Sequence, residues 1–420
     1  EVSLDLLKNA SEIAQEQIES IGGTTSTVNF GELLDRIVKD ALQEKASDIH
    51  IEPGEHDVVI RYRVDGMLRE VLKLEKELEQ ALVFKVKINS KLRTDEHFAP
   101  QDGRIRFTFD GKNIDTRISI LPTTKGEKIV IRLLTSEGNA YDLENLGIVD
   151  RELAVIKKSY QKPYGMILAV GPTGSGKTTT LYSILKILNS REVNITTVED
   201  PVEYDIPGIN HVQINNKADL TFANGLRAIL RQDPNIVMIG EIRDNETARI
   251  AINAAMTGHL VLSTLHTNDS VTTVPRLVDM GVEPFLLAST LNVIIAQRLA
   301  RKLCEKCKEK YNITQKNIDE VKELRPDISE LLVDGATIYR EKGCDTCNKT
   351  GFKGRIGLYE VLEIKESIRR IIIEKSSNAD DIFESAKKDG LSLIVEDGVK
   401  KLKQGIISIS ELIRVTAIKE

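Results

Sequence analysis

The chain has 420 residues, and at about 100–200 residues per domain this length predicts two to four domains rather than one small binding module. Its 58 basic and 64 acidic side chains give a net charge of −6, and aromatic residues make up only 4% with no tryptophan. A global basic field and a supply of base-stacking rings are both lacking, so no nucleic acid is expected as a main partner.

The N-terminal part predicts a remnant segment followed by an α+β domain. Residues 1–27 combine a helical apolar pattern with a Gly-Gly pair and a Thr/Ser-rich stretch, so we expect the remnant helix and linker of a missing N-terminal domain. The domain itself is expected over residues 28–135. Its predicted helices lie near 29–45 and 77–92, and its predicted strands near 58–64, 67–72, 105–109, 114–120 and 129–134.

After an expected interdomain linker over residues 136–150, the pattern changes to short apolar strands that alternate with amphipathic runs. This alternation predicts a parallel sheet covered on both faces, within a second domain over residues 151–420. The predicted strands lie at 166–170, 195–198, 236–239 and 260–264, and helices follow near 368–374, 380–388, 391–405 and 410–418.

The most specific motif is residues 171–178, which fit G-x-x-x-x-G-K-[ST] between a predicted strand and a predicted helix. In such a loop, glycines let backbone N–H groups face a polyphosphate, the lysine reaches its β- and γ-phosphates, and the following hydroxyl can ligate Mg²⁺. The motif therefore predicts ATP or GTP binding. We expect contacts from Gly171, Pro172, Thr173, Gly174, Ser175, Gly176, Lys177, Thr178 and Thr179.

Hydrolysis also requires an acid near the metal and a group that orients water, usually at the end of a neighbouring strand. Glu241 follows the strand 236–239, with Gly240 in the usual place of the metal aspartate, and Glu199 ends the strand 195–198. The alternative for Glu241 is a solvated strand-end acid. For Glu199 and its neighbour Asp200, the alternative is an ordinary loop that begins at the following proline and is capped by the aspartate side chain.

Two histidines flank the strand 260–264. His266, just after the strand, is a candidate to donate a hydrogen bond to the γ-phosphate, and His259 before it is a weaker candidate. A hydrogen-bonded structural histidine is the alternative for both.

The four cysteines form two C-x-x-C pairs, Cys304 with Cys307 and Cys344 with Cys347. Two such pairs make a tetrahedral thiolate site for structural Zn²⁺ in a reducing compartment, so a zinc element is expected at about 300–360, with helices between the pairs. A redox dithiol and unbound thiols are the alternatives. With no secretory signal and no apolar run of membrane-spanning length, a cytoplasmic location is expected.

Several segments resemble, in order, the Walker A loop, Asp box, atypical Walker B segment and His box of the secretion ATPases, which drive type II secretion and type IV pilus assembly. These segments are residues 171–178, 197–203, 230–244 and 257–267. Further matches at 46–53, 100–105, 296–299 and 354–360 extend the resemblance over roughly residues 28–420.

The resemblance implies a RecA-like P-loop ATPase domain of the α/β class, joined to a smaller α+β PAS-like domain and assembled as a homohexamer. It also implies that Glu199 polarises the attacking water and that Glu241 works at Mg²⁺. Arg104 and Arg117 match the arginines that the N-terminal domain of that family supplies to the nucleotide. Arginine suits this role because a guanidinium fork pairs well with phosphate oxygens. The roles of Arg227 and Arg231 stay open.

The function that this resemblance implies is a Mg²⁺-dependent motor ATPase, peripheral at the inner membrane. It would move a platform protein that assembles pilin or pseudopilin subunits. The tetracysteine element matches assembly-type members of the family and argues against a pilus retraction motor. The alternatives are a nucleic-acid translocase with the same core and a noncatalytic zinc scaffold that only binds nucleotide.

Overall fold

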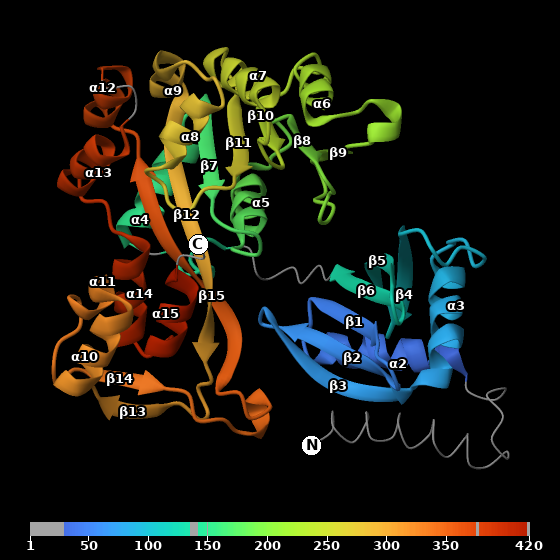
Figure 1. The fold of residues 1–420 in the computed structure, drawn as a ribbon. Coiled ribbons are helices and arrows are strands. Elements are labelled where there is room, and N and C mark those ends of the chain that lie inside the picture. The colour runs from blue at the N-terminus through green and yellow to red at the C-terminus, as the bar shows by residue number, and fades with distance from the viewer. Residues whose placement is uncertain (1–28, 135–141, 149, 375–377, 418–420) are drawn as a thin grey trace, which may run out of the picture. The chain divides into compact units, whose positions relative to one another are not determined.

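The chain divides into two compact units, residues 1–137 and 138–420, each drawn in the computed structural model of Figure 1. The structure describes residues 29–134, 142–148, 150–374 and 378–417. The helix and linker predicted for residues 1–27 lie outside this range, as do residues 136–141 and 149 of the linker predicted over 136–150. Within that linker, Leu143 and Ile148 are buried in the core of the second unit. The predicted domain boundaries stay predictions.

The first unit is a six-stranded antiparallel sheet with the strand order β3-β2-β1-β6-β5-β4. Two helices cover one face of this sheet. The side chain of Asn29, the N-cap of α2, accepts hydrogen bonds from backbone N–H groups of the first turn. The elements are α2 (Phe30–Gln43), β1 (Asp48–Pro53), β2 (Asp57–Val64), β3 (Met67–Glu75), η2 (Lys76–Leu78), α3 (Glu79–Asn89), β4 (Gln101–Phe109), β5 (Lys112–Thr123) and β6 (Gly126–Leu134).

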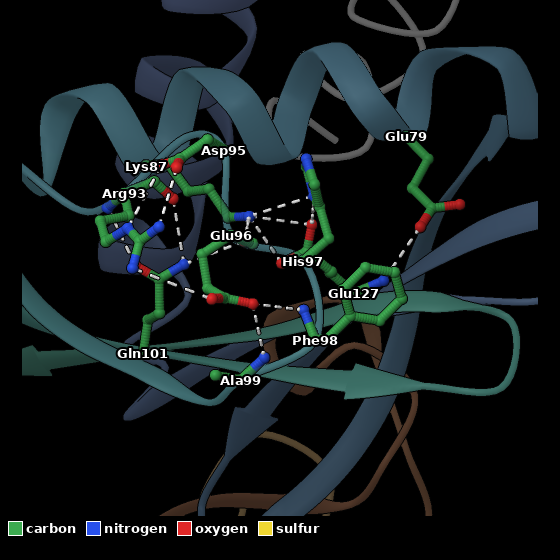
Figure 2. A network of polar contacts seen from close by, with 10 residues as sticks. All are labelled: Glu79, Lys87, Arg93, Asp95, Glu96, His97, Phe98, Ala99, Gln101 and Glu127. Atoms are coloured by element: carbon green, nitrogen blue, oxygen red, sulfur yellow. Dashed lines mark hydrogen bonds and ion pairs between the residues drawn. The ribbon is translucent and has the colours of Figure 1, made fainter.

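A buried lysine holds the segment between α3 and β4 in place (Figure 2). The Lys87 ammonium is fully buried, pairs with Glu127 at 2.7 Å and donates to the Glu96 carbonyl oxygen at 2.6 Å. His97 Nδ1 lies 2.7 Å from the same Glu127 carboxylate. The Glu96 side chain accepts the backbone N–H of Phe98, which is 93% exposed. A buried ion pair and its hydrogen bonds therefore help to fix the segment that leads into β4.

The second unit contains a seven-stranded sheet with the order β15-β12-β7-β11-β10-β8-β9. Neighbouring strands are parallel except for the first pair in this order, in which β15 runs antiparallel to β12. The strands are β7 (Gly165–Val170), β8 (Ile195–Glu199), β9 (Asn210–Gln213), β10 (Ile236–Ile239), β11 (Leu260–Leu265), β12 (Leu291–Leu303) and β15 (Phe352–Glu363). The parallel core strands are buried on both faces, as the predicted alternation of strands and helices requires.

Helices cover both faces of this sheet (Figure 1). One face packs against α4 (Asp150–Tyr160) and α5 (Lys177–Leu188), and the other against α6 (Phe222–Ile229), α7 (Asn245–Met256), α8 (Thr273–Asp279) and α9 (Pro284–Thr290). The C-terminal helices are α12 (Glu366–Glu374), α13 (Ala379–Lys388), α14 (Ile394–Lys403) and α15 (Ile409–Thr416). A short turn, η3 (Asn216–Ala218), precedes α6.

The segment between the two cysteine pairs differs from the prediction of helices alone. It contains α10 (Gln315–Leu324) and α11 (Pro326–Ser329), but these lie between the two strands of an antiparallel ribbon, β13 (Glu309–Asn312) and β14 (Thr337–Arg340). The ribbon was not predicted because its strands are only four residues long and have few apolar residues.

Candidate active site and metal centre

The predicted phosphate loop connects the buried strand β7 to the N-terminus of α5. Gly171, Gly174 and Gly176 all have positive φ angles, of 141°, 76° and 91°, which glycine adopts without steric cost. Gly176 is the N-cap of α5, so the next residue, Lys177, begins the helix. The loop therefore places free backbone N–H groups and the positive end of a helix dipole at one point, which suits a polyphosphate.

The side chain of Gln297 on β12 supports this loop through two hydrogen bonds. Its side chain accepts from the Thr180 hydroxyl at 2.9 Å and donates to the Ser175 carbonyl oxygen at 2.8 Å. A Cβ atom at Gly171 would lie 2.5 Å from the Gln297 carbonyl oxygen, so only glycine fits there. The sequence analysis assigned no role to Gln297, although a polar residue directly after the apolar run 293–296 is a signal that could have identified it.

Lys177 folds back onto its own loop, where its ammonium donates to the carbonyl oxygens of Gly171 at 2.8 Å and Pro172 at 3.1 Å. Burial lowers the pKa of Lys177 to about 8. The negative charge of Glu241 opposes this fall, and the positive charge of Arg298 adds to it. The ammonium is thus charged at neutral pH and available to exchange these carbonyl oxygens for phosphate oxygens.

This pKa predicts that nucleotide affinity falls in alkaline solution. A bound polyphosphate favours the charged ammonium, so above pH 8 binding requires the uptake of one proton. We expect the Kd for ATP, measured by calorimetry, to rise roughly tenfold between pH 7.5 and 9. In a Lys177→Arg variant, the guanidinium stays charged and this part of the profile should be flat. A Kd for the unmodified chain that stays constant over this range would contradict the prediction.

The structure brings Glu241 and His266 together at the carboxyl edge of the sheet. Glu241, just after β10, lies 3.2 Å from the Nε2 atom of His266, just after β11. Arg243 pairs with the other carboxylate oxygen at 2.5 Å, a contact that the sequence analysis did not anticipate. The Glu241 carboxylate is near enough to Lys177 to oppose the fall in its pKa, so the acid and the phosphate loop face one site.

Glu199 occupies a different environment at the end of the neighbouring strand β8. Its side chain is buried, and it accepts hydrogen bonds from Tyr182 at 2.5 Å and Thr197 at 2.6 Å. His211 Nδ1 lies 3.0 Å from the same carboxylate. The alternative of a loop acid for Glu199 does not describe this site, because three side chains from three elements enclose it.

The other residues singled out in the second unit have local partners. The Nδ1 atom of His259 is 2.9 Å from the Ala254 carbonyl oxygen, a structural contact at the end of α7. Arg227 pairs with Glu246 at 2.5 Å, and Arg231 donates to the Arg227 carbonyl oxygen at 3.0 Å.

Arg104 and Arg117 lie directly opposite each other on β4 and β5 in the first unit. The same cross-strand row continues through Arg132 of β6 to Asp48 of β1, which pairs with Arg132 at 3.0 Å. Basic side chains thus gather along the sheet face that α2 and α3 leave uncovered, a placement suited to a phosphate.

The four cysteines come together although they lie far apart in the sequence. Their sulfur atoms are all within 4.8 Å of one another, with separations of 3.9, 3.8 and 3.7 Å for three of the pairs. Tetrahedral Zn²⁺ with Zn–S bonds of about 2.3 Å requires sulfurs about 3.8 Å apart, so the arrangement fits a four-coordinate metal. Burial alone would raise the pKa of the Cys347 thiol, but the backbone N–H groups of Cys344 and Gly351 and neighbouring thiols lower it to about 6.

Comparisons with known proteins test the family that the sequence predicts. The family model described as type II/IV secretion system protein matches residues 25–414. The chain belongs to this family. It is 45% identical over 417 residues to the type II secretion system protein E of Pseudomonas aeruginosa, covering 99% of this chain and 80% of that protein. It is 43% identical over 410 residues to the type IV pilus assembly ATPase PilB of Myxococcus xanthus, covering 97% and 72%.

Solved structures of secretion ATPases share the fold of this type II/IV secretion system protein. The pilus retraction motor PilT with bound ADP matches with a TM-score of 0.62 and 25% identity, covering 92% of this chain and 97% of that one. The ATPase DotB of Legionella pneumophila matches with a TM-score of 0.67 and 23% identity, covering 93% and 96%. The predicted family and the RecA-like α/β fold with an additional N-terminal domain are therefore confirmed. Among the described residues, none of the helices has the length and apolarity to cross a membrane.

Proposed function

We propose that this type II/IV secretion system protein hydrolyses ATP at the phosphate loop and uses the energy to drive assembly of pilin or pseudopilin subunits. The observation that supports this most directly is the convergence of Lys177, Glu241 and His266 at the carboxyl edge of one parallel sheet. A binding-only scaffold would not need an acid and an imidazole beside the loop that receives the phosphates.

Each residue has a specific part in the proposed reaction. Lys177 exchanges its loop carbonyl oxygens for phosphate oxygens, and His266 donates to the γ-phosphate. Thr178 and Glu241 would hold Mg²⁺ through the hard oxygen ligands that this ion prefers, and the bound ion would neutralise charge on the phosphates. Glu199 orients the attacking water. Arg104 and Arg117 contribute guanidinium groups to the phosphates from the first unit.

We propose that hydrolysis becomes movement through nucleotide-driven rotation between the two main domains. The arginines lie on a sheet face of the first unit, and the phosphate loop lies in the second unit. We propose that six copies form a ring and act on a platform protein at the inner membrane. The chain would then be a cytoplasmic protein that meets the membrane through its partners.

The tetracysteine cluster is proposed to hold one structural Zn²⁺. All four ligand positions would be filled by Cys304, Cys307, Cys344 and Cys347, which leaves none open for catalysis. The cluster begins directly after β12, the strand that carries Gln297, so it would fix the far end of the strand that braces the phosphate loop.

A Glu241→Gln variant tests the proposed hydrolysis. We expect kcat for ATP hydrolysis to fall about 100-fold or more, because the amide cannot serve as an anionic oxygen ligand or accept a proton. ATP affinity measured without Mg²⁺ should stay within about threefold, since Lys177 and the loop are unchanged. The matched control is Glu366→Gln, an exposed acid on α12 that pairs only with a neighbouring arginine among the contacts described. Hydrolysis at the rate of the unmodified chain would refute the assignment.

A further inference from the structure

The side chains around Glu199 form a buried network whose members have no assigned role. Tyr182 comes from α5, the helix that Lys177 begins, and His211 comes from the edge strand β9. Glu199 itself is only 2% exposed and lies between them at the end of β8. Three elements that are adjacent only in the folded chain therefore meet at one carboxylate.

The direction of each hydrogen bond follows from the chemistry of the partners. An ionised carboxylate only accepts, so Tyr182 donates its hydroxyl proton to Glu199 Oε2 at 2.5 Å. Burial, together with the adjacent Glu199 charge, raises the pKa of Tyr182 well above its ordinary value, which keeps this proton on the phenol. Tyr204 packs edge-on against the Tyr182 ring with centroids 4.5 Å apart and restricts its movement.

The orientation of His211 is fixed from its far side. The backbone N–H of Ile206 donates to His211 Nε2 at 3.2 Å, so this nitrogen carries no proton. We therefore assign the proton of the neutral ring to Nδ1, which lies 3.0 Å from Glu199 Oε1 and 2.9 Å from the Thr197 hydroxyl. The single Nδ1–H group is therefore a donor that the Glu199 carboxylate shares with the Thr197 hydroxyl oxygen.

Counting acceptor positions shows what the network leaves available. A carboxylate has about four lone-pair positions, and three side-chain donors occupy three of them. Oε1 faces Thr197 and His211, whereas Oε2 faces only Tyr182. One lone pair on Oε2 therefore has no side-chain donor among the contacts described. The three donors also provide hydrogen-bond partners for a buried polar group, whose burial without partners would be costly.

We propose that Tyr182 and His211 are positioning residues that fix the orientation of the Glu199 carboxylate and aim its remaining Oε2 lone pair at one water molecule. This inference rests on the proposed role of Glu199 in orienting the attacking water. Because Tyr182 belongs to the phosphate-loop helix, the position of the water is set by the element that holds the phosphates.

The first test is a double-mutant cycle between Tyr182→Phe and Glu199→Gln, with kcat and KM for ATP measured in the full chain. We expect Tyr182→Phe to lower kcat about 10- to 100-fold and leave KM within about threefold, since only the carboxylate loses a donor. In the Glu199→Gln background, the same change should alter kcat less than about twofold. A Tyr62→Phe control removes a buried tyrosine hydroxyl in the first unit, which donates to the Ile37 carbonyl oxygen at 2.9 Å, and should leave kcat unchanged.

The second test uses rescue at His211. Asparagine can place an amide N–H close to the Nδ1 position, so His211→Asn should keep kcat within about fivefold, whereas His211→Leu should lower it more than about tenfold. Equal loss in both variants would overturn the positioning role. If Glu199→Gln lowers kcat but Tyr182→Phe does not, the inference fails and the proposed function stands. If Glu199→Gln itself leaves kcat unchanged, the proposed role of Glu199 fails as well.

Discussion

A Cys304→Ser variant is expected to lose the bound metal and to unfold at a temperature about 10 °C lower than the unmodified chain. The sulfur atoms already stand at the separations that tetrahedral Zn²⁺ requires, so the free energy of metal binding contributes directly to folding. A hydroxyl at this position is a much weaker ligand than a thiolate and leaves three ligands. We expect a loss of roughly 4 kcal/mol or more in the free energy of unfolding.

The measurement is metal content by elemental analysis together with a thermal unfolding curve. The unmodified chain should carry about one Zn²⁺, and Co²⁺ substituted into the site should give the intense absorption of a cobalt–thiolate centre. A matched control is Thr337→Ser, which changes one exposed side chain on β14 of the same element and should keep the metal. The proposed centre would be contradicted if the unmodified chain carried no Zn²⁺ and unfolded at the same temperature as the Cys304→Ser variant.

The parallel core of the second unit could be predicted because its strands are short apolar runs that are followed by the candidate functional side chains. The carboxyl ends of adjacent parallel strands meet at one edge, so Glu241 after β10 and His266 after β11 were predictable neighbours of the phosphate loop. The spacing of the loop itself requires glycines at positions with positive φ, and the structure has them there.

The long strand β12 was not predicted as a strand. Its first half is mostly apolar and short, which does not distinguish a buried strand from a buried helix, and its second half is basic. Strand β1 was missed for another reason: it contains Asp48, whose partners Arg63 and Arg132 come from strands elsewhere in the sequence. Both strands form through pairing with segments that are distant in the sequence, and a local sequence pattern carries no information on such pairing.

The surroundings of Glu199 depend on packing that no local pattern encodes. Tyr182 reaches the carboxylate only because α5 packs against this side of the sheet, and His211 only because β9 pairs with β8 in one register, with His211 opposite Thr197. The sequence could identify the Glu199 carboxylate but not its hydrogen-bond donors. Only the structure reveals Tyr182 and His211 as parts of this site.

The most direct test of the central claim is phosphate release from Mg²⁺-ATP by the purified chain and by a Lys177→Ala variant. Lys177 is the group that exchanges loop carbonyl oxygens for phosphate oxygens, so its loss removes both binding and charge stabilisation in the transition state. A Lys316→Ala variant, changed at an exposed side chain on α10, controls for the loss of a lysine. We expect hydrolysis by the unmodified chain and the control, and a kcat/KM for Lys177→Ala lower by about 1,000-fold. Equal phosphate release by all three proteins would contradict hydrolysis at this loop.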